Sequence, residues 1–381
     1  MILPSEEIKF SEENLERWNL VRDFQKRLAP LLKKRTPTKT ENDPRRTLSI
    51  DDYFSLVLFA MFNPVIDTMR GLCYATTLAK VQRDVCSGPV SLGSFSEAQH
   101  LYDPELLRNL MQQISLQAQP NFGDVRLKEL GKELAAVDGT LIPALSRMSW
   151  ALWQDENHRA AKFHVKFSVL RQTVLDATLT TGNGSERDEL RKLWKPDEFY
   201  SGDRGYGADY SFLGEMRQAG CSFAIRIRND AVMDEVQSLP LSDEDQKAGV
   251  VSDQWVNLGK QWNDEPIRVV RIRDYDTELL IATDRADLPA ELISLIYRYR
   301  WQIELFFKWI KCILGCRHLL AESPHGVAIQ LYCACIVALM LTIATGRKPT
   351  KRHWELIQWY MSGMATLDEL LKGLGVNKKM A

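Results

Sequence analysis

The stretch Tyr297–Lys311, Y-R-Y-R-W-Q-I-E-L-F-F-K-W-I-K, predicts the element around which the rest of the chain is organised. It contains four basic residues, one carboxylate and six aromatic residues, with no Gly or Pro to break a helix. A helix turns by about 100° per residue. On such a helix five polar side chains lie within roughly 40° of one line parallel to its axis, namely Tyr297, Arg300, Glu304, Lys308 and Lys311. An apolar stripe runs beside this line and consists of Ile296, Ile303, Phe307, Ile310 and Leu314. We therefore predict a helix that packs the stripe on a sheet and presents one carboxylate among cations.

Two interpretations of this charged edge are open on periodicity alone. In one, Glu304 pairs with Arg300 and Lys308 only to stabilise a solvated amphipathic helix. In the other, the cations bind phosphate and Glu304 binds a metal ion, because the charges gather on one edge instead of scattering in mixed pairs. A lone Glu cannot hold a catalytic metal ion, so the second interpretation requires carboxylates from elsewhere in the chain.

Length and composition describe a globular protein of two or three units. The chain has 381 residues, of which 45% are hydrophobic and 26% charged. The net charge is −1, so any surface that binds nucleic acid must be local. The seven cysteines form no C-x2-C pair, which indicates reduced thiols in a cytosolic setting. Cys312-x3-Cys316-x-His318 lacks an evident fourth ligand, so we do not predict a zinc site there.

Neither a leader nor a membrane span is predicted. The first residues, M-I-L-P-S-E-E, lack the charged and apolar regions of a signal peptide. Residues Val327–Thr345 are almost continuously apolar and about as long as a membrane span. This segment is isolated and contains Gln330, so we interpret it as a buried core helix.

The first 125 residues predict an all-α region that binds DNA ends. Helices are expected at residues 11–35, with Ser11 as N-cap, at Ile50–Phe62, at Pro64–Leu78, and from the cap-like Ser94-Phe-Ser-Glu97 to about Gln117. Between Lys26 and Arg46 lie eight basic and two acidic residues, among them Lys33, Lys34 and Arg35. This basic run is either a solvated linker or a track for a phosphate backbone, and the sequence leaves both open.

From Leu130 onward the pattern changes to alternating strands and helices. Strands are expected at Glu133–Val137, ending in Asp138, at Lys162–Arg171 and at Thr173–Thr180, the last two forming an antiparallel meander. A helix at Ser185–Leu193, a short strand at 198–206 that presents Asp203, a helix at 209–219 and a strand at 222–227 follow. Three antiparallel strands, then helix, strand, helix and strand is the order of a ribonuclease-H-like α/β fold.

The predicted catalytic domain spans residues 126–345. Within it, residues 229–290 contain an acidic turn, Ser242-Asp-Glu-Asp245, and several strand-like segments, which predict a mostly β insertion. Residues 346–381 predict a C-terminal helical region. It contains an aromatic helix at His353–Tyr360 and a short helix opened by the capping box Thr366-x2-Glu369.

Asp138 and Asp203 are the carboxylates that Glu304 requires. Each is expected at the end of a strand, and a glycine stands next to each, Gly139 and Gly202, which leaves room for a phosphate. Taken singly, an Asp after a strand is more often a turn or cap residue. Cleavage of a phosphodiester by two divalent ions needs two or three carboxylates on rigid elements, and together these three supply them.

Three motifs in this order resemble those of a known family. Asp138-Gly-Thr, Asp203-x-Gly-Tyr and Tyr297-x2-Arg300-x3-Glu304-x6-Lys311 resemble the DDE domain of insertion-sequence transposases, in the insertion-sequence-four family with its Tyr-Arg-Glu-Lys signature. The resemblance covers roughly residues 130–345. It implies metal-dependent cleavage of DNA at the ends of a mobile element and transfer of the 3′-hydroxyl ends into target DNA.

The resemblance also implies roles for single residues. Asp138, Asp203 and Glu304 would form the catalytic triad and bind two Mg2+ ions, for which Mn2+ could substitute. Tyr297, Arg300, Lys308 and Lys311 would hold the phosphates of the element's end. Trp255 and Trp262 are candidates for stacking on a flipped base, although an ordinary aromatic pair in a β core or hairpin is the commoner explanation for either residue.

The implied partners are double-stranded DNA, as terminal inverted repeats and as target, and a second copy of the chain in a synaptic dimer. The implied location is the bacterial cytoplasm, in association with the nucleoid. A DNA-binding regulator that has lost cleavage and a ribonuclease-H-like nuclease that never joins strands are the alternatives. The intact triad argues against the first, and the β insertion with the cations around Glu304 argues against the second.

Overall fold

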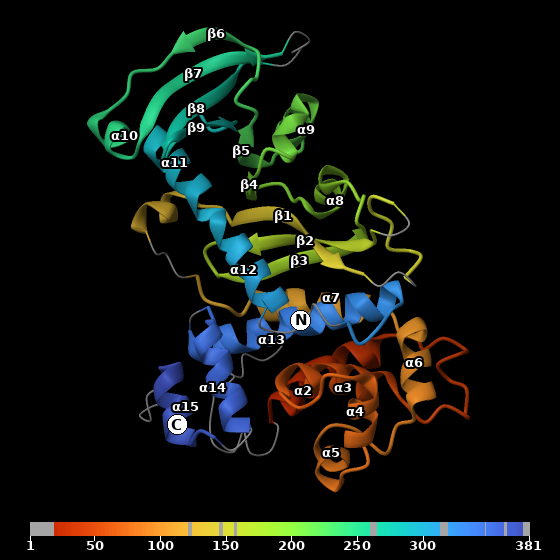
Figure 1. The fold of residues 1–381 in the computed structure, drawn as a ribbon. Helices are drawn as coiled ribbons and strands as arrows, with labels where there is room; N and C mark the ends of the chain where they lie inside the picture. Colours follow the sequence, from red (N-terminus) through yellow and green to blue (C-terminus); the bar gives the residue numbers. More distant parts are fainter. Residues whose placement is uncertain are drawn as a thin grey trace.

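A large mixed sheet forms the centre of the molecule (Figure 1). The computed structural model describes residues 19–120, 124–144, 148–155, 158–259, 265–312, 319–346, 348–361 and 364–375. The strands are β1 (Leu134–Pro143), β2 (Ala160–Ser168), β3 (Thr173–Thr181), β4 (Phe199–Gly202), β5 (Ser222–Ile227), β6 (Met233–Ser238), β7 (Val250–Leu258), β8 (Ile267–Asp274) and β9 (Thr277–Thr283). They form a nine-stranded sheet in the order β3-β2-β1-β4-β5-β9-β8-β7-β6.

The half of the sheet from β3 to β5 agrees with the predicted element order. Strands β1, β2 and β3 pair antiparallel, whereas β4 and β5 are added parallel to β1. The predicted meander is confirmed as β2 and β3, and the two later strands are confirmed as β4 and β5. The prediction that the first strand ends at Asp138 is wrong. β1 continues to Pro143 because β2 pairs with it over its full second half.

Residues 229–290 extend the sheet instead of interrupting it. Strand β9 pairs antiparallel with β5, through Ala224 opposite Thr283, and β8, β7 and β6 follow outward. The acidic segment predicted as a turn is the short helix α10 (Asp243–Lys247). It forms because Ser242 and Asp245 make a capping box, in which each side chain accepts a hydrogen bond from the other residue's backbone N–H.

Helices pack on both faces of the β1–β5 half. Successive residues of β1 belong to different hydrophobic clusters, since Ala135 and Val137 join one and Ala136 the other. On the Val137 face lie α8 (Glu186–Leu193) and α9 (Tyr210–Gln218). Ser185 caps α8 as predicted, and its hydroxyl accepts the N–H of Asp188. On the Ala136 face lie the long helices of the second half of the chain.

The charged stretch Tyr297–Lys311 lies in two helices that meet at Arg300. They are α11 (Ala290–Tyr299) and α12 (Trp301–Cys312). Arg300 keeps helical dihedrals, but its N–H bonds to the carbonyl of Tyr297, three residues back, so the turn tightens there. The predicted apolar stripe is confirmed, since Ile296, Ile303, Phe307 and Ile310 are all buried; Leu314 lies outside the described residues.

In the described part of the N-terminal region every regular element is a helix, as predicted. The helices are α2 (Asn19–Lys34), α3 (Ile50–Phe62), α4 (Met69–Ala75), α5 (Ala79–Asp84), α6 (Leu92–Leu101) and α7 (Glu105–Ser115), followed by the 3-10 turn η1 (Val125–Leu130). The start predicted at Ser94–Glu97 is wrong, because Ser91 caps α6 and accepts the N–H of Ser94. The helix predicted from Pro64 begins only at Met69, where Thr68 provides the cap. The cap predicted at Ser11 lies outside the described residues.

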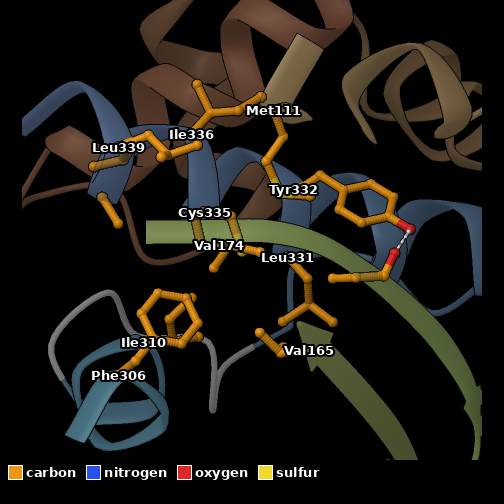
Figure 2. Packing of buried hydrophobic residues seen from close by; sticks show 14 of the residues in the cluster. Met111, Val165, Val174, Phe306, Ile310, Leu331, Tyr332, Cys335, Ile336 and Leu339 are labelled. Atoms are coloured by element: carbon orange, nitrogen blue, oxygen red, sulfur yellow. Dashed lines mark hydrogen bonds between the residues drawn. The ribbon is translucent and has the colours of Figure 1, made fainter. Parts of the chain in front are cut away.

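Helix α13 (Pro324–Thr345) is the core helix that the sequence predicts. It is long and apolar enough to cross a membrane, but 94% of its most apolar window is buried inside the protein. Figure 2 shows why: Leu331 and Cys335 face the sheet at Val165 and Val174, and Met111 of α7 lies on the opposite side. The Tyr332 hydroxyl donates a hydrogen bond of 3.0 Å to the carbonyl of Ala177 in β3. The helix thus fills the space between the sheet and the N-terminal helices.

The start of α13 is fixed by a residue more than 200 positions earlier. The side-chain oxygen of Gln99 in α6 accepts the N–H groups of Glu322 and Ser323, at 2.7 and 3.0 Å. The Ser323 hydroxyl donates to the Gln99 carbonyl at 2.6 Å and accepts the N–H of Gly326 as N-cap. A Cβ on Gly326 would lie 2.8 Å from that of Gln99, so this approach requires glycine.

The last helices that the structure describes are α14 (Lys351–Met361) and α15 (Leu367–Leu374). The predicted capping box of Thr366 and Glu369 is present at the start of α15. A single hydrophobic cluster extends from Val21 in α2, through α13, to Leu374 in α15. The N-terminal helices therefore share one core with this face of the sheet.

Prediction from the sheet: the buried ion pair between β7 and β8 holds the outer strands. The carboxylate of Asp253 accepts bonds of 2.9 and 2.6 Å from Arg268, which also donates to the carbonyls of Arg285 and Leu288. Asp253→Ala leaves this guanidinium buried without its counter-ion, and we expect a loss of about 3–5 kcal/mol in urea unfolding. Asp234→Ala, on the exposed strand β6, should change stability by less than about 0.5 kcal/mol. Equal effects for the two variants would contradict this account.

Candidate functional site

Parallel pairing of β1 with β4 brings two carboxyl groups side by side. The last paired row joins Val137 to Gly202, so Asp138 and Asp203 occupy the next row on neighbouring strands. Strands lie about 4.8 Å apart in this direction. Asp138 is therefore inside β1 but at the point where β4 stops, and its side chain is 17% exposed.

The side chains of this row point to the face that carries α11 and α12. Asp138 alternates with Val137 and shares the face of Ala136, which belongs to the cluster of the long helices. Glu304 reaches the same place from the first turn of α12. The connection is direct, since the Arg300 guanidinium lies 2.6 Å from a Glu304 oxygen and 3.7 Å from an Asp138 oxygen. The structure thus joins two of the three predicted carboxylates through the arginine of the same motif.

Burial and like charge dominate the electrostatics of Asp138. Its burial, and next the charge of Asp203, raise the pKa of this carboxyl to about 7, against the N–H of Gly139 and the charge of Arg300, which lower it. Burial disfavours the charged form of Arg300, but Tyr297, Glu304 and Asp138 together raise its pKa. The Arg300 guanidinium thus lies between the carboxylates of Asp138 and Glu304.

Tyr297 supports Arg300 from below. Its ring is 7% exposed and lies 5.6 Å from the guanidinium carbon of Arg300, a cation–π distance. Burial raises the pKa of the Tyr297 phenol, so it stays neutral. Tyr297, which the sequence predicts to hold a phosphate, is thus buried and packs against the Arg300 guanidinium. The Nε atom of Arg300 finds no hydrogen-bond partner among the described residues, although it is buried.

Glu186, at the start of α8, is a fourth carboxylate that the sequence interpretation missed. Its oxygens would lie 2.9 Å from a Cβ on Gly139 and 3.3 Å from one on Gly205, so glycine at both positions makes room for it. It pairs with Lys162 at 3.4 Å, and its charge contributes to the raised pKa of Asp138. Burial raises the pKa of Glu186 as well. The available signal was the acidic first turn after Gly182-Asn-Gly, which predicted only a helix start.

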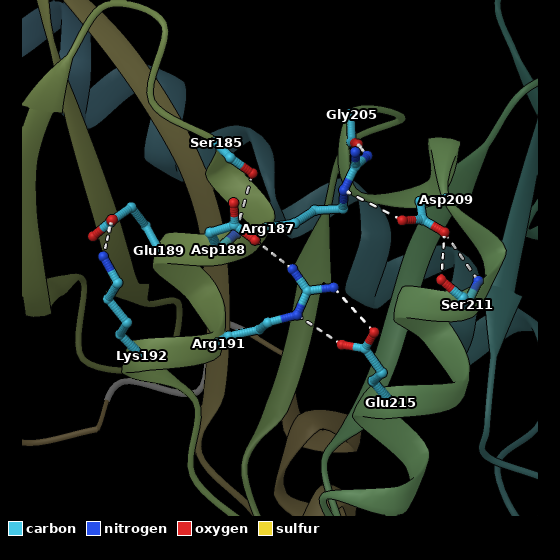
Figure 3. Close-up of polar contacts among 10 residues, drawn as sticks. All are labelled: Ser185, Arg187, Asp188, Glu189, Arg191, Lys192, Gly205, Asp209, Ser211 and Glu215. Carbon is cyan, nitrogen blue, oxygen red and sulfur yellow. Dashed lines mark hydrogen bonds and ion pairs between the residues drawn. The ribbon is translucent and has the colours of Figure 1, made fainter.

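The turn that carries Asp203 is tied to α8 and α9 (Figure 3). The N–H of Gly205 donates to Asp203 at 2.8 Å, while Arg187 donates to the Gly205 carbonyl at 2.9 Å. One turn further along α8, Arg191 makes a bidentate pair with Glu215 of α9, at 2.7 and 3.1 Å. These contacts fix the turn between the end of β4 and α9.

The oxygen ligands of this site suit a hard divalent cation. Carboxylate oxygens from Asp138, Asp203 and Glu304, with Glu186 nearby, are the ligands that Mg2+ and Mn2+ prefer. Burial, and next the charge of Asp203, raise the pKa of Asp138 to about 7, so its charged form is disfavoured there, and a nearby cation would favour that form. In the described ranges, no three His, Cys, Asp or Glu side chains stand close enough together to enclose an ion. Arg300, which lies between Asp138 and Glu304, provides the positive charge there.

The remaining predicted residues are spread more widely. Lys308 is exposed one turn beyond Glu304, and Lys311 follows on the same helix. Trp255 is half-buried on β7, five strands from β1, or roughly 24 Å along the sheet. Trp262 lies outside the described residues.

The basic run of the N-terminal region lies beyond α13 as seen from the sheet (Figure 1). Lys33 and Lys34, in the last turn of α2, are exposed. Arg35 is partly buried and bound to Glu41. Two of the three predicted cations thus face solvent, and the third has an internal partner.

Residues 129–340 match the family model of the transposase DDE domain. Two curated relatives agree with this match. A protein of Sinorhizobium fredii assigned as transposase y4zB is 28% identical over 218 residues, which cover 55% of this chain and 60% of that protein. A protein of Geobacillus stearothermophilus assigned as the transposase of insertion sequence element IS5377 is 26% identical over 246 residues, covering 62% of this chain and 64% of that protein. The matches thus span less than two thirds of either relative.

One solved structure is similar in outline over most of the chain. It is the cryo-EM structure of a piggyBac transposase synaptic complex with hairpin DNA. The superposition covers 97% of this chain and 83% of that one, with a TM-score of 0.46 and 10% sequence identity.

Prediction from the electrostatics: Asp138 destabilises the fold above neutral pH when no divalent cation is added. Its pKa is raised in the folded state from 3.8 to about 7, so folding favours the protonated form. Stability from this group is present below pH 4 and lost as the pH rises toward 7. Asp138→Asn should therefore stabilise the protein at pH 8 relative to pH 4, by on the order of a few kcal/mol, measured as Tm against pH.

Asp209→Asn is the control of opposite sign. Hydrogen bonding by Ser211 lowers the pKa of Asp209, so its stabilising effect is present above the unfolded pKa. That variant should lose stability at pH 8. A gain at pH 8 for both variants, or for neither, would contradict the assignment of the shift to Asp138.

Proposed function

Since this chain belongs to the family of transposase DDE domains, we propose that it is the transposase of an insertion sequence. In this proposal it cleaves DNA at the two ends of the element and transfers the resulting 3′-hydroxyl ends into target DNA. The observation that carries the proposal is the row of Asp138 and Asp203 on neighbouring strands, facing Glu304 across Arg300. In this proposal the three carboxylates, on a strand, on a turn braced by two helices and on helix α12, would supply the rigid set that phosphodiester chemistry requires.

The finer classification is part of the proposal. The strand order β3-β2-β1-β4-β5, antiparallel in its first three strands and parallel in the last two, supports a ribonuclease-H-like catalytic domain at residues 126–345. Residues 1–125 would be the region that binds DNA ends, and residues 346–381 a C-terminal helical region. The motif Tyr297-x2-Arg300-x3-Glu304-x6-Lys311 supports membership of the insertion-sequence-four group.

Asp138, Asp203 and Glu304 would hold two Mg2+ ions, or Mn2+ in their place. Bound there, the ions would supply Lewis-acid chemistry, which lowers the pKa of water and stabilises charge on a leaving oxygen. The chain's own residues orient the substrate: Arg300, aligned by the ring of Tyr297, meets the phosphate next to the cleaved bond. Lys308 and Lys311 hold phosphates further along α12 as point charges. No side chain is needed as nucleophile, because water and then the DNA 3′-hydroxyl serve in that role.

The proposed partners follow from the same chemistry. Terminal inverted repeats and target DNA are the substrates, and two chains would bring two ends together as a homodimer. Lys33 and Lys34 supply exposed cations for the backbone of the repeat. Trp255 and Trp262 remain the candidates for base stacking. The proposed location is the bacterial cytoplasm, on the nucleoid.

Prediction for the triad: Glu304→Gln abolishes Mg2+-dependent nicking and leaves DNA binding within about twofold. The amide still accepts a hydrogen bond from Arg300, but it carries no charge for a metal ion. The substrate is a plasmid that carries the inverted repeats flanking the gene. Glu355→Gln is the matched control, because Glu355 also stands in an i,i+4 pair, with Lys351, and its side chain is 33% exposed against 32% for Glu304. Undiminished nicking by Glu304→Gln removes Glu304 from the triad, and nicking without strand transfer by the unmutated protein indicates a nuclease.

Prediction for the cation: Arg300→Ala weakens binding of the repeat and reduces the slope of log Kd against log salt by about 0.9, the value for one phosphate contact. The physical reason is the loss of the guanidinium that the Tyr297 ring aligns. Fluorescence anisotropy at several salt concentrations measures the slope. An unchanged slope places Arg300 in the scaffold, as the bridge between Asp138 and Glu304 only.

A further inference from the structure

An arginine-lined groove opens beside Asp203 and includes Arg204 and Gly205 of the Asp203-x-Gly-Tyr motif. It has a volume of about 580 Å³ and lies between the turn at 204–208 and the end of β5 with its following turn, 226–230. Three of its lining residues are arginines, namely Arg204, Arg226 and Arg228, and one is acidic, Asp230. The groove is therefore net positive in a chain whose total charge is −1.

Strand pairing places Arg226 in the same row as the two aspartates. Gly202 of β4 pairs with Ile225 of β5, so Asp203 and Arg226 occupy the next row, as Asp138 and Asp203 do one strand earlier. Ala224 belongs to the hydrophobic cluster of the Ala136 face and Ile225 to the other, so Arg226 shares the face of Asp138. Two carboxylates and one guanidinium thus follow one another across three adjacent strands.

The backbone around Arg226 is held closely, and its head group is incompletely bonded. A Cβ on Gly207 would lie 2.2 Å from the Arg226 carbonyl oxygen, so the turn after Asp203 packs directly on this residue. The Arg226 Nε atom is buried and has no hydrogen-bond partner among the described residues. The charge of Arg226 also acts on the Tyr297 phenol, which stands under Arg300. The groove and the carboxylate site therefore lie within electrostatic reach of each other.

Arg228 forms an ion pair with the nearby Asp230. Its guanidinium makes a bidentate pair with Asp230, at 2.8 and 2.7 Å, on the exposed side of the groove. Both side chains are more than 60% exposed, so the pair is weak. A phosphate can replace the carboxylate in the same two-pronged geometry.

We propose that this groove holds the DNA phosphates that flank the cleaved bond, with Arg226 at the end of β5 nearest to the carboxylates and Arg228 in the turn that follows. This assignment rests on the proposed function, which places the cleaved phosphate at Asp138 and Asp203. Arginine forks bind phosphate oxygens in pairs, and three arginines line this groove. The DNA strand would thus run from α12 across the aspartates to β5.

The test is the salt dependence of binding to a fluorescein-labelled duplex of arbitrary sequence, between about 50 and 200 mM salt. Arg226→Gln and Arg228→Gln should each reduce the slope of log Kd against log salt by about 0.9, and the double variant by about twice that. Lys372→Gln is the control of equal charge, since Lys372 is exposed on α15, far from β5 in Figure 1. An unchanged slope in the double variant overturns the proposal, as does an equal reduction in the control.

A second variant acts in the opposite direction and guards against misfolding. Asp230→Asn frees Arg228 and removes one negative charge, so it should tighten duplex binding several-fold. Unchanged or weaker binding by Asp230→Asn counts against the groove. Metal-dependent nicking by the unmutated protein, measured in parallel, separates the two proposals. If the variants alter the salt-dependence slopes but the unmutated protein does not nick DNA, the groove is supported and the transposase proposal is contradicted. If the unmutated protein nicks DNA but the variants leave the slopes unaltered, the transposase proposal is supported and the groove is contradicted.

Discussion

Four rows of parallel pairing between β1 and β4 are the constraint on which the site depends. They end at Val137 and Gly202, so two carboxyl groups must stand next to each other on the face that α11 and α12 cover. Such a pair is unfavourable when both groups are charged, and burial together with the charge of Asp203 raises the pKa of Asp138. Arg300 offsets part of the cost because the tightened turn between α11 and α12 directs it into the pair. The position of the Arg300 guanidinium thus depends on the strand pairing, on the turn between the two helices and on the charges around it.

Much of the site could be predicted from the sequence because its signals are local. The spacing of Tyr297, Arg300 and Glu304 fixes their common edge on any helix. The alternation of β2 and β3 and the Ser185 cap are likewise written in neighbouring residues. The position of Asp138 within β1 could not be predicted, because it depends on β2 pairing further along β1 than β4 does. Glu186 was missed for a similar reason. An acidic residue in the first turn of a helix is explained by the helix start alone, and only the structure shows that Gly139 and Gly205 make room for this side chain.

The continuity of the sheet also changes the meaning of residues 229–290. An insertion suggests an appended unit, but β9 pairs with β5 and continues the hydrogen-bonded ladder outward. The buried pair of Asp253 and Arg268 then connects β7 to the segment before α11. Trp255, on β7, therefore stands at a fixed offset from the carboxylates.

The contact between Gln99 and the start of α13 has a consequence for how the chain is made. The two partners are 224 residues apart, and α13 fills the space on which α3, α6 and α7 close. Helices that emerge early from the ribosome must wait, with their apolar faces uncovered, for a segment synthesised much later. Their native packing is reached only once Pro324–Thr345 has been translated. Fragments that stop short of this helix lack the surface on which α3, α6 and α7 pack.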